Sequence, residues 1–209
     1  MADIHEISEF LQKGRAKNVK ALVEEALAEG QDPKVILNDG LLAGMMVIGE
    51  KFKNNEVFVP EVLVAARALN AGLAILEPKL IEVGNEPVGK VVIGTVKGDL
   101  HDIGKNLVAM MMKGVGFEVI DLGRDVPVET VVDTVREKDV HLVGLSALMT
   151  TTLKSMEETI AALHAAKLDC KIMVGGAVLT PEYAEKIGAD WYAKDAKRSA
   201  DIAKEFFGV

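Results

Sequence analysis

The spacing of apolar residues changes near residue 88, and this change limits the folds that the chain can adopt. Through residues 1–82, apolar side chains recur every three or four positions, as in segment 19–27, where they fall on one face of a helix. From Lys90 onward, short β-branched runs alternate with helical stretches. The pattern therefore predicts a helical domain with its linker over residues 1–88 and an α/β domain over residues 89–209.

The first domain contains residues that typically begin and end helices. Gly30 ends one helix, Asp32 and Pro33 begin the next, and Pro60 opens the last. Four or five helices with short connections are typical of an antiparallel bundle. Residues 83–89 hold two glycines and a proline without periodicity, and they are expected to form a linker. The residues expected to face inward on the last helix are Leu63, Ala66, Leu69, Leu73, Leu76 and Leu80.

Five short apolar runs in the second domain indicate β-strands, at 91–95, 117–122, 141–146, 171–176 and 190–193. The first, third and fourth are apolar on both faces, as in the buried strands of a parallel sheet. Helical stretches lie between them, near 105–115, 128–138, 152–167, 180–187 and 196–207. The predicted fold class is a helical bundle followed by a flavodoxin-like or Rossmann-like five-stranded parallel sheet.

The composition argues against several functions. With 24 basic and 32 acidic residues, the net charge of −8 disfavours nonspecific binding to nucleic acid or anionic lipid. No run approaches the roughly 18 uncharged apolar residues of a membrane span. The single cysteine, Cys170, allows neither an intrachain disulfide nor a cysteine-based zinc site. The N-terminal segment carries acids and has no apolar signal core, so a cytoplasmic location is expected.

The loop after the first predicted strand, TVKGDLHDIGKN (95–106), is the first candidate site, because ligands of open α/β sheets bind beyond the carboxyl ends of the strands. A phosphate-binding P-loop does not fit this segment. Five residues separate Gly98 from Gly104, and Asn106 stands where a magnesium-binding hydroxyl is required. The GxGxxG pattern of dinucleotide sites is also absent.

The same loop holds Asp99, His101 and Asp102, followed by Gly104 at the start of a helix. A carboxylate two residues before the histidine can accept a hydrogen bond from one ring nitrogen, which leaves the other nitrogen basic and able to bind a metal. One histidine cannot hold a zinc or iron ion alone, so the remaining ligands would come from a macrocycle. The alternative is a surface loop whose acids favour the helix N-terminus.

Small and hydroxyl residues follow the other predicted strands. The turn after the third strand is rich in hydroxyls, and the turn after the fourth holds paired glycines that permit close backbone approach. Helix caps and a tight turn explain them equally well. Together they favour a channel for a long, flat organic tail. The residues concerned are Ser146, Leu148, Thr150, Thr152, Gly175, Gly176, Ala193 and Asp195.

At this point the sequence resembles the cobalamin-binding domain family. The resemblance rests on three motifs in order: D-x-H-x-x-G at Asp99, His101 and Gly104, S-x-L at Ser146 and Leu148, and the pair Gly175-Gly176. The first domain, with V-F-V-P-E at 57–61, is similar to the cap domain of methyl-transferring corrinoid proteins. The resemblance thus covers nearly the whole chain and points to the corrinoid subunits of anaerobic methyltransferase systems.

The resemblance implies roles for individual residues. His101 would be the lower axial ligand of cobalt, Asp99 its hydrogen-bond partner and Thr152 the hydroxyl that completes the relay. The cofactor would be cobalamin or a related corrinoid, alternating between cob(I)alamin and methylcob(III)alamin. The other residues expected to bind it are Asp102, Ile103, Gly104, Ser146, Leu148, Thr150, Gly175, Gly176, Ala193 and Asp195.

The function implied by the resemblance is that of a methyl carrier, a component that does not act alone. A substrate-specific methyltransferase would load cobalt, and a second methyltransferase would pass the methyl group to tetrahydrofolate or a thiol coenzyme. A reductive reactivase is the expected third partner, and the helical cap would shield the methyl group, with 83–89 as a hinge. The alternatives are a B12-binding sensor, a mutase small subunit and a cofactor-free flavodoxin-like interaction domain.

Overall fold

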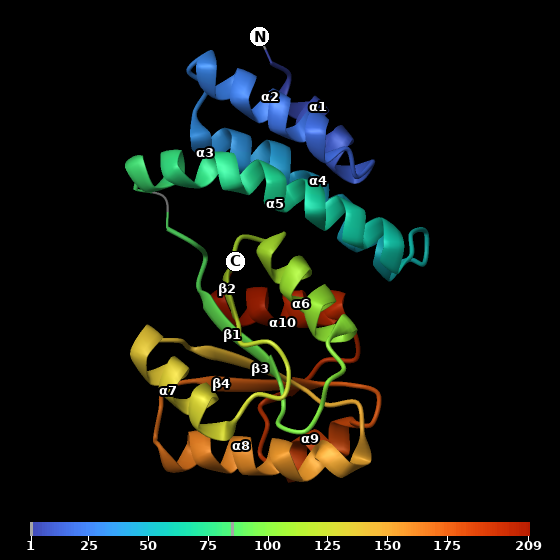
Figure 1. Cartoon of the computed structure of the whole chain (residues 1–209), viewed down its shortest axis with the longest axis vertical. Coiled ribbons are helices and arrows are strands. Elements are labelled where there is room, and N and C mark those ends of the chain that lie inside the picture. The colour runs from blue at the N-terminus through green and yellow to red at the C-terminus, as the bar shows by residue number, and fades with distance from the viewer. Residues whose placement is uncertain (1, 85) are drawn as a thin grey trace. The chain divides into compact units, whose positions relative to one another are not determined.

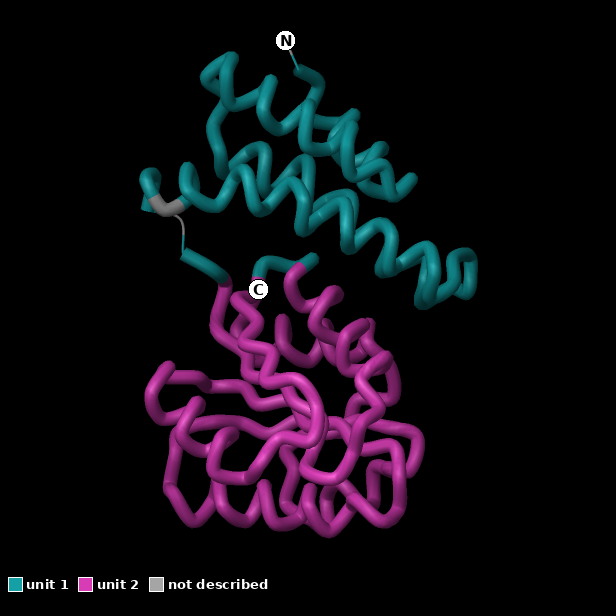
Figure 2. Tube along the Cα trace, in the orientation of Figure 1, with its two compact units in different colours: residues 1–87, 114–116 teal, residues 88–113, 117–209 magenta. Residues whose placement is uncertain are grey.

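The computed structural model describes residues 2–84 and 86–209. It divides into two compact units, residues 1–87 with 114–116 (unit 1) and residues 88–113 with 117–209 (unit 2) (Figure 2). Asn85, in the predicted linker, lies outside the described residues. Each unit has buried hydrophobic residues of its own.

Unit 1 is helical throughout its secondary structure (Figure 1). Its elements are α1 (Ile4–Gln12), α2 (Ala16–Ala28), α3 (Pro33–Val35), the π-helical segment η1 (Ile36–Leu42), α4 (Ala43–Lys53) and α5 (Val59–Glu82). Two of the starts have side-chain caps, because the carboxylates of Asp3 and Asp32 accept hydrogen bonds from the backbone N–H groups of His5 and Lys34. Pro33 occupies the first turn of α3, where its missing N–H costs nothing.

The core of unit 1 depends on close helix contacts. A Cβ atom at Gly40 would lie 3.2 Å from Ile7 Cγ2, and one at Gly44 would lie 3.0 Å from the Ser8 carbonyl oxygen. Glycine at these two positions therefore lets α1 approach η1 and α4. The largest fully buried side chains of this core are Ile7, Leu11, Ile36, Leu41, Met45, Ile48, Leu69 and Leu76.

The inward face of α5 differs from the predicted one at its first position. Ala66, Leu69, Leu76 and Leu80 are buried and Leu73 is half-buried, but Leu63 is 39% exposed, so that prediction is wrong. Val62, with no exposed surface, takes the inward position instead. The reason is the phase of the helix, since Leu69 and Leu76 lie on the same stripe as Val62 and not on that of Leu63.

Among the described residues, α5 is the one helix long and apolar enough to cross a membrane by length and composition, over Val59–Leu80 with a mean hydropathy of 1.5. Core helices of soluble proteins pass the same test. Helix α5 packs against α1, α2 and α4 within unit 1. Of the apolar stretch, 39% is buried within the structure, and Glu61 and Arg67 are exposed.

Unit 2 is a five-stranded parallel sheet in the order β2-β1-β3-β4-β5, the flavodoxin-like order, which confirms the predicted fold class. The strands are β1 (Lys90–Thr95), β2 (Glu118–Asp121), β3 (Leu142–Ser146), β4 (Lys171–Gly175) and β5 (Trp191–Tyr192). The connecting elements are α6 (Ile103–Lys113), α7 (Val128–Lys138), η2 (Thr150–Thr152), α8 (Leu153–Ala165), α9 (Pro181–Lys186) and the C-terminal α10 (Ala196–Phe207).

The two faces of the sheet carry different helices. Helices α7, α8 and α9 cover one face, and α6 and α10, which contact each other, cover the opposite face (Figure 1). The core beneath α7 and α8 contains Val92, Val143 and Ile172 from the three central strands. Because side chains alternate along a strand, their neighbours Ile93, Gly144 and Met173 face α6 and α10.

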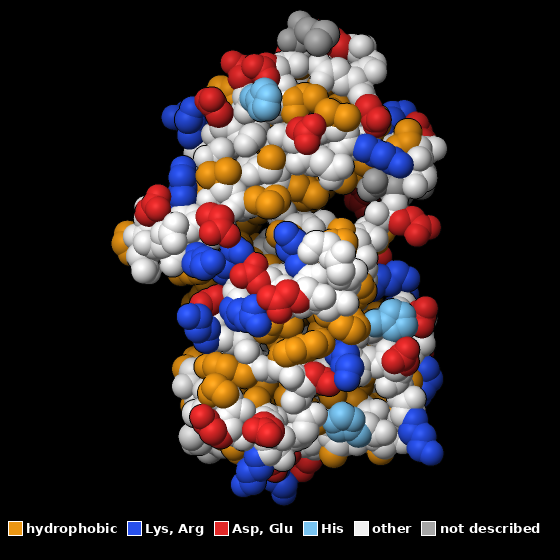
Figure 3. Space-filling model, turned by 180° about the vertical axis from the view of Figure 1, so that it is seen from behind, with side chains coloured by type: hydrophobic (Ala, Val, Ile, Leu, Met, Phe, Trp, Pro, Cys, Tyr) orange, Lys and Arg blue, Asp and Glu red, His pale blue; other side chains and the backbone are white. Residues whose placement is uncertain are grey.

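The surface of both units mixes charges of opposite sign. On the face drawn in Figure 3, basic and acidic side chains are interspersed, with apolar side chains exposed between them. Some charged side chains form ion pairs within their own helix, such as Lys79–Glu82 in α5 at 2.9 Å and Lys197–Asp201 in α10 at 2.5 Å. A mixed surface of this kind is typical of a soluble domain with a modest net charge.

Gly176 places the turn after β4 directly against the turn after β3. Its φ is +140°, and a Cβ atom there would overlap the Ala147 carbonyl oxygen. Gly123 also has a positive φ, +84°, but a Cβ atom there meets open space. An alanine at Gly123 would therefore meet only backbone strain, whereas an alanine at Gly176 would also meet steric overlap.

We expect Gly123→Ala to lower the free energy of unfolding by about 1–2 kcal/mol, the cost of the left-handed backbone alone. Gly176→Ala should cost about 3 kcal/mol or more, because the Ala147 backbone must also move. Urea denaturation of the two variants beside the wild type measures both values. Equal losses in the two variants would show that the overlap at Ala147 is relieved without cost.

Candidate functional site

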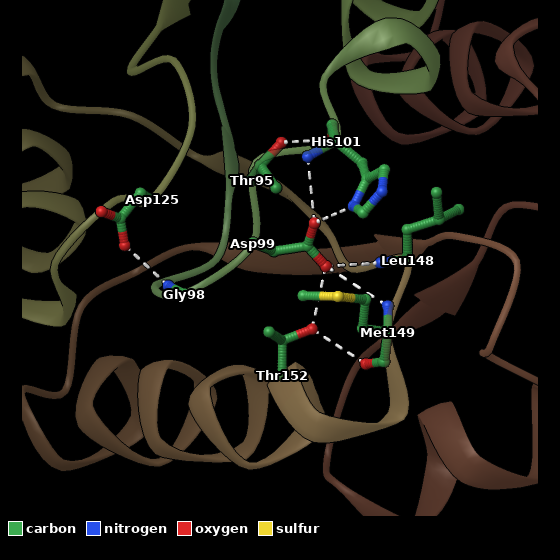
Figure 4. A network of polar contacts seen from close by, with 8 residues as sticks. All are labelled: Thr95, Gly98, Asp99, His101, Asp125, Leu148, Met149 and Thr152. Carbon is green, nitrogen blue, oxygen red and sulfur yellow. Dashed lines mark hydrogen bonds and ion pairs between the residues drawn. The ribbon is translucent and has the colours of Figure 1, made fainter.

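His101 stands in the loop between β1 and α6, at the carboxyl edge of the sheet, and both its ring and its backbone are held (Figure 4). Its Nδ1 lies 2.8 Å from Asp99 Oδ1, and its backbone N–H donates to the same oxygen at 3.0 Å. The Thr95 hydroxyl donates to the His101 carbonyl oxygen at 3.1 Å. One hydrogen bond therefore orients the imidazole, and two more hold the backbone that carries it.

Asp99 is fully buried and links this loop to the one after β3. Its Oδ2 accepts hydrogen bonds from the backbone N–H groups of Leu148 at 2.8 Å and Met149 at 3.3 Å. The Thr152 hydroxyl lies 2.9 Å from the same oxygen and 2.8 Å from the Met149 carbonyl oxygen (Figure 4). The hydrogen-bond partners of Oδ1 and those of Oδ2 thus belong to two loops that are far apart in the sequence.

The hydrogen bonds decide the charge of Asp99. Burial alone would raise its pKa, because it disfavours the charged form. The hydrogen bonds from Leu148, from the backbone and ring of His101, and from Thr152 outweigh burial and hold the pKa of Asp99 well below its usual range. A buried charge of this kind is tolerated only where such donors surround it.

The charge of Asp99 fixes the tautomer of His101. An ionised carboxylate can only accept hydrogen bonds, so Nδ1 of the ring must carry the proton. Within the described part of the chain, Nε2 has no hydrogen-bond partner, and the side chain is half exposed. The lone pair on Nε2 is therefore not used by the described residues, and Nε2 is the atom through which the ring can bind a metal.

Beside His101, a cavity of about 530 Å³ lies between the sheet and helices α6 and α10. It brings together most of the residues predicted from the sequence, namely His101, Asp102, Ile103, Gly104, Ser146, Leu148, Gly175, Gly176, Ala193 and Asp195. Asp99 and Thr152 lie behind the imidazole and do not line the cavity, and Thr150 is an exposed residue of η2 outside its lining. A binding role for Thr150 stays a prediction.

Sequence reasoning missed the lining of the cavity by β1, β3 and β4. Ile93, Gly144 and Met173 line it from the middle of the strands, and Ser199 lines it from α10. A glycine inside a strand marks close approach by another group, so Gly144 carried a signal that could have been used. Ile93 and Met173 required the register of the sheet, and Ser199 required the position of α10.

An ion pair made by a buried lysine of the cavity lining was also missed. Lys105, 4% exposed, places its Nζ 2.6 Å from Asp121 Oδ2 and 2.6 Å from Asn106 Oδ1. Asp121 also accepts a hydrogen bond from the Gly123 backbone N–H at 2.8 Å, so the pair joins the first turn of α6 to the end of β2. Helical spacing could have indicated it, because Lys105 lies one turn before the buried Ala109.

The donor set fits a metal that brings its own equatorial ligands. The described residues contain no group of three or more His, Cys, Asp or Glu side chains that could hold an ion. Leu100, Ile103 and Leu148 expose 59%, 69% and 40% of their surface beside His101, and a flat apolar ring would cover them. The neighbouring cavity can take an organic tail. These features together fit a corrinoid.

Two sequence patterns of B12 binding domains match the chain, one over residues 89–201 and the other over residues 3–77. The chain is 42% identical to dimethylamine corrinoid protein 3 of Methanosarcina acetivorans over 98% of its own length and 99% of that protein. The chain belongs to the B12-binding corrinoid proteins. Its cofactor is cobalamin or a related corrinoid.

Two further relatives extend this result. The trimethylamine corrinoid protein 1 of Methanosarcina acetivorans is 44% identical to this corrinoid protein over 84% of this chain and 83% of the relative. A chain of the crystal structure of the methanol:cobalamin methyltransferase complex from Methanosarcina barkeri superimposes with a TM-score of 0.91 at 28% identity. That match covers 98% of this corrinoid protein and 79% of the other chain. The predicted resemblance is thereby confirmed.

We expect Thr152→Val to lower the unfolding free energy of the apoprotein by about 1.5–3 kcal/mol, because the variant removes a hydrogen bond to a buried carboxylate at nearly constant volume. Thr152→Ser keeps the hydroxyl and should recover most of the loss. Urea denaturation measures both effects. If the valine and serine variants were equally stable, the hydroxyl at 152 would not support Asp99.

Proposed function

We propose that this protein carries methyl groups between two methyltransferases. Support comes from the names of its relatives, which include dimethylamine and trimethylamine corrinoid proteins, and from its similarity to a chain of a methanol:cobalamin methyltransferase complex. When bound, the corrinoid supplies a cobalt ion that accepts a methyl group and later gives it up. The chain itself supplies binding, ligation and orientation.

We propose His101 as the lower axial ligand of the cobalt. The observation that carries this assignment is the outward Nε2, left free by the hydrogen bond between Nδ1 and Asp99 at 2.8 Å. Asp99 would keep the ring in one tautomer and one orientation. Thr152, Leu148 and Met149 would act through Asp99 by keeping it charged and in place.

The cavity next to His101 is proposed to hold the nucleotide tail of the corrinoid. Its lining is mostly apolar, and the paired glycines after β4 leave room for close contact with the backbone. Ser146 and Asp195 are the polar side chains that we expect to orient the tail. A flat organic group with a few polar atoms matches this lining better than a compact phosphate does.

The proposed partners follow from the carrier role. A substrate-specific methyltransferase would deliver the methyl group, and a second methyltransferase would transfer it to tetrahydrofolate or a thiol coenzyme. A reductive reactivase would restore cobalt that has been oxidised. Dimethylamine, trimethylamine and methanol, which the names of the relatives contain, are the first donors to test.

His101→Ala should still bind hydroxocobalamin through the cavity, but its visible absorption spectrum should differ from that of the wild type, because the axial nitrogen is missing. His164→Ala is the matched control, since that ring contacts the Gly188 carbonyl oxygen at 3.0 Å, outside the cavity lining. Absorption spectra of the three loaded proteins make the comparison. A wild-type spectrum in His101→Ala would contradict axial ligation by His101.

The carrier role itself is tested by loading with methyl groups. The purified protein, reconstituted with hydroxocobalamin and reduced without oxygen, should become methylated when a dimethylamine, trimethylamine or methanol methyltransferase and its substrate are added. Radiolabelled substrate measures the methyl group retained by the protein. Omitting the methyltransferase is the control. A protein that binds hydroxocobalamin but takes no methyl group from any of these pairs would argue against the carrier role.

A further inference from the structure

The inner end of the cavity is formed by one row of residues across the sheet. Ile93 of β1 pairs with Gly144 of β3, and Gly144 pairs with Met173 of β4. All three line the cavity. Since the row lies within the strands, it lines the inner end of the cavity, the part farther from the turns that follow β3 and β4.

Gly144 is the one member of this row without a side chain. Its neighbours along β3, Val143 and Leu145, belong to the core under α7 and α8, so position 144 points to the opposite face, where the cavity lies. A glycine inside a strand weakens the strand because it has nothing to pack. The space that Gly144 leaves in the cavity therefore explains why a glycine occupies the centre of the row.

The space above Gly144 is narrow. A Cβ atom there would lie 3.1 Å from Ile93 Cγ2 and 3.8 Å from Met173 Cε. A single methyl group would need the Ile93 side chain to shift by a few tenths of an ångström. A branched side chain would extend further, between Ile93 and Met173, and occupy the inner end of the cavity.

We propose that Gly144 sets the depth of the cavity and so restricts binding to corrinoids according to the length of their nucleotide tail. The row offers two apolar side chains and no charged group, so it suits an apolar, uncharged part of the tail. A corrinoid without this tail does not reach the row. This inference rests on the proposed function, because it assumes that the tail enters this cavity.

The test uses Gly144→Ala and Gly144→Val with two probes, hydroxocobalamin, which has the full tail, and cobinamide, which lacks the nucleotide. Gly94→Ala is the matched control. Gly94 is also a glycine inside a strand, and a Cβ atom there would lie 3.3 Å from Val126 Cγ2, on the opposite face of the sheet and outside the cavity. Equilibrium titration followed by absorbance measures both affinities, and circular dichroism confirms folding.

We expect Gly144→Val to weaken hydroxocobalamin binding by about tenfold or more, with a smaller loss in Gly144→Ala, while cobinamide binding changes by less than about threefold. Gly94→Ala should bind both probes as the wild type does. Unchanged hydroxocobalamin binding in both variants, or equal loss of both probes in a folded Gly144→Ala, would overturn the inference. If Gly144→Val does not fold, the alanine variant decides. A wild type that binds neither probe would instead overturn the proposed function.

Discussion

The hydrogen bond between Asp99 and His101 is the interaction on which the site depends. It requires a charged carboxylate with no exposed surface, which by itself is strongly unfavourable. The structure offsets that cost with donors from two loops, and those loops can meet only because β1 and β3 are neighbours in the sheet. The strand order, the buried charge and the orientation of the imidazole therefore depend on one another.

This dependence explains how much of the site could be predicted. Asp99 and His101 are two residues apart in one loop, so their contact was accessible from spacing and residue chemistry alone. Leu148 and Thr152 lie 49 and 53 residues beyond Asp99, and only the match of three motifs to a known family linked Thr152 to it. The backbone contact from Met149 had no sequence signal, because any residue supplies an N–H.

The fold class could be predicted from the sequence because apolar residues are spaced differently in a helical bundle and in a parallel sheet with helices. The errors arise where the phase of an element matters, as at Leu63, which lies one position away from the buried stripe of α5. The Lys105–Asp121 pair shows a second limit of prediction from the sequence. A buried lysine contradicts the usual preference, and only the three-dimensional position of Asp121 at the end of β2 makes it favourable.

Strand β3 and the turn after it contribute to three features of unit 2. Gly144 leaves space in the cavity, Leu145 packs in the opposite core, and Leu148 and Thr152 hold Asp99. Because side chains alternate across a sheet, the first two features lie on opposite faces, and the third begins only after the strand has ended. The shape of the cavity can therefore change at position 144 while the support of His101 keeps its geometry. Variation in what the cavity accepts is thus compatible with a constant position of the His101 ring.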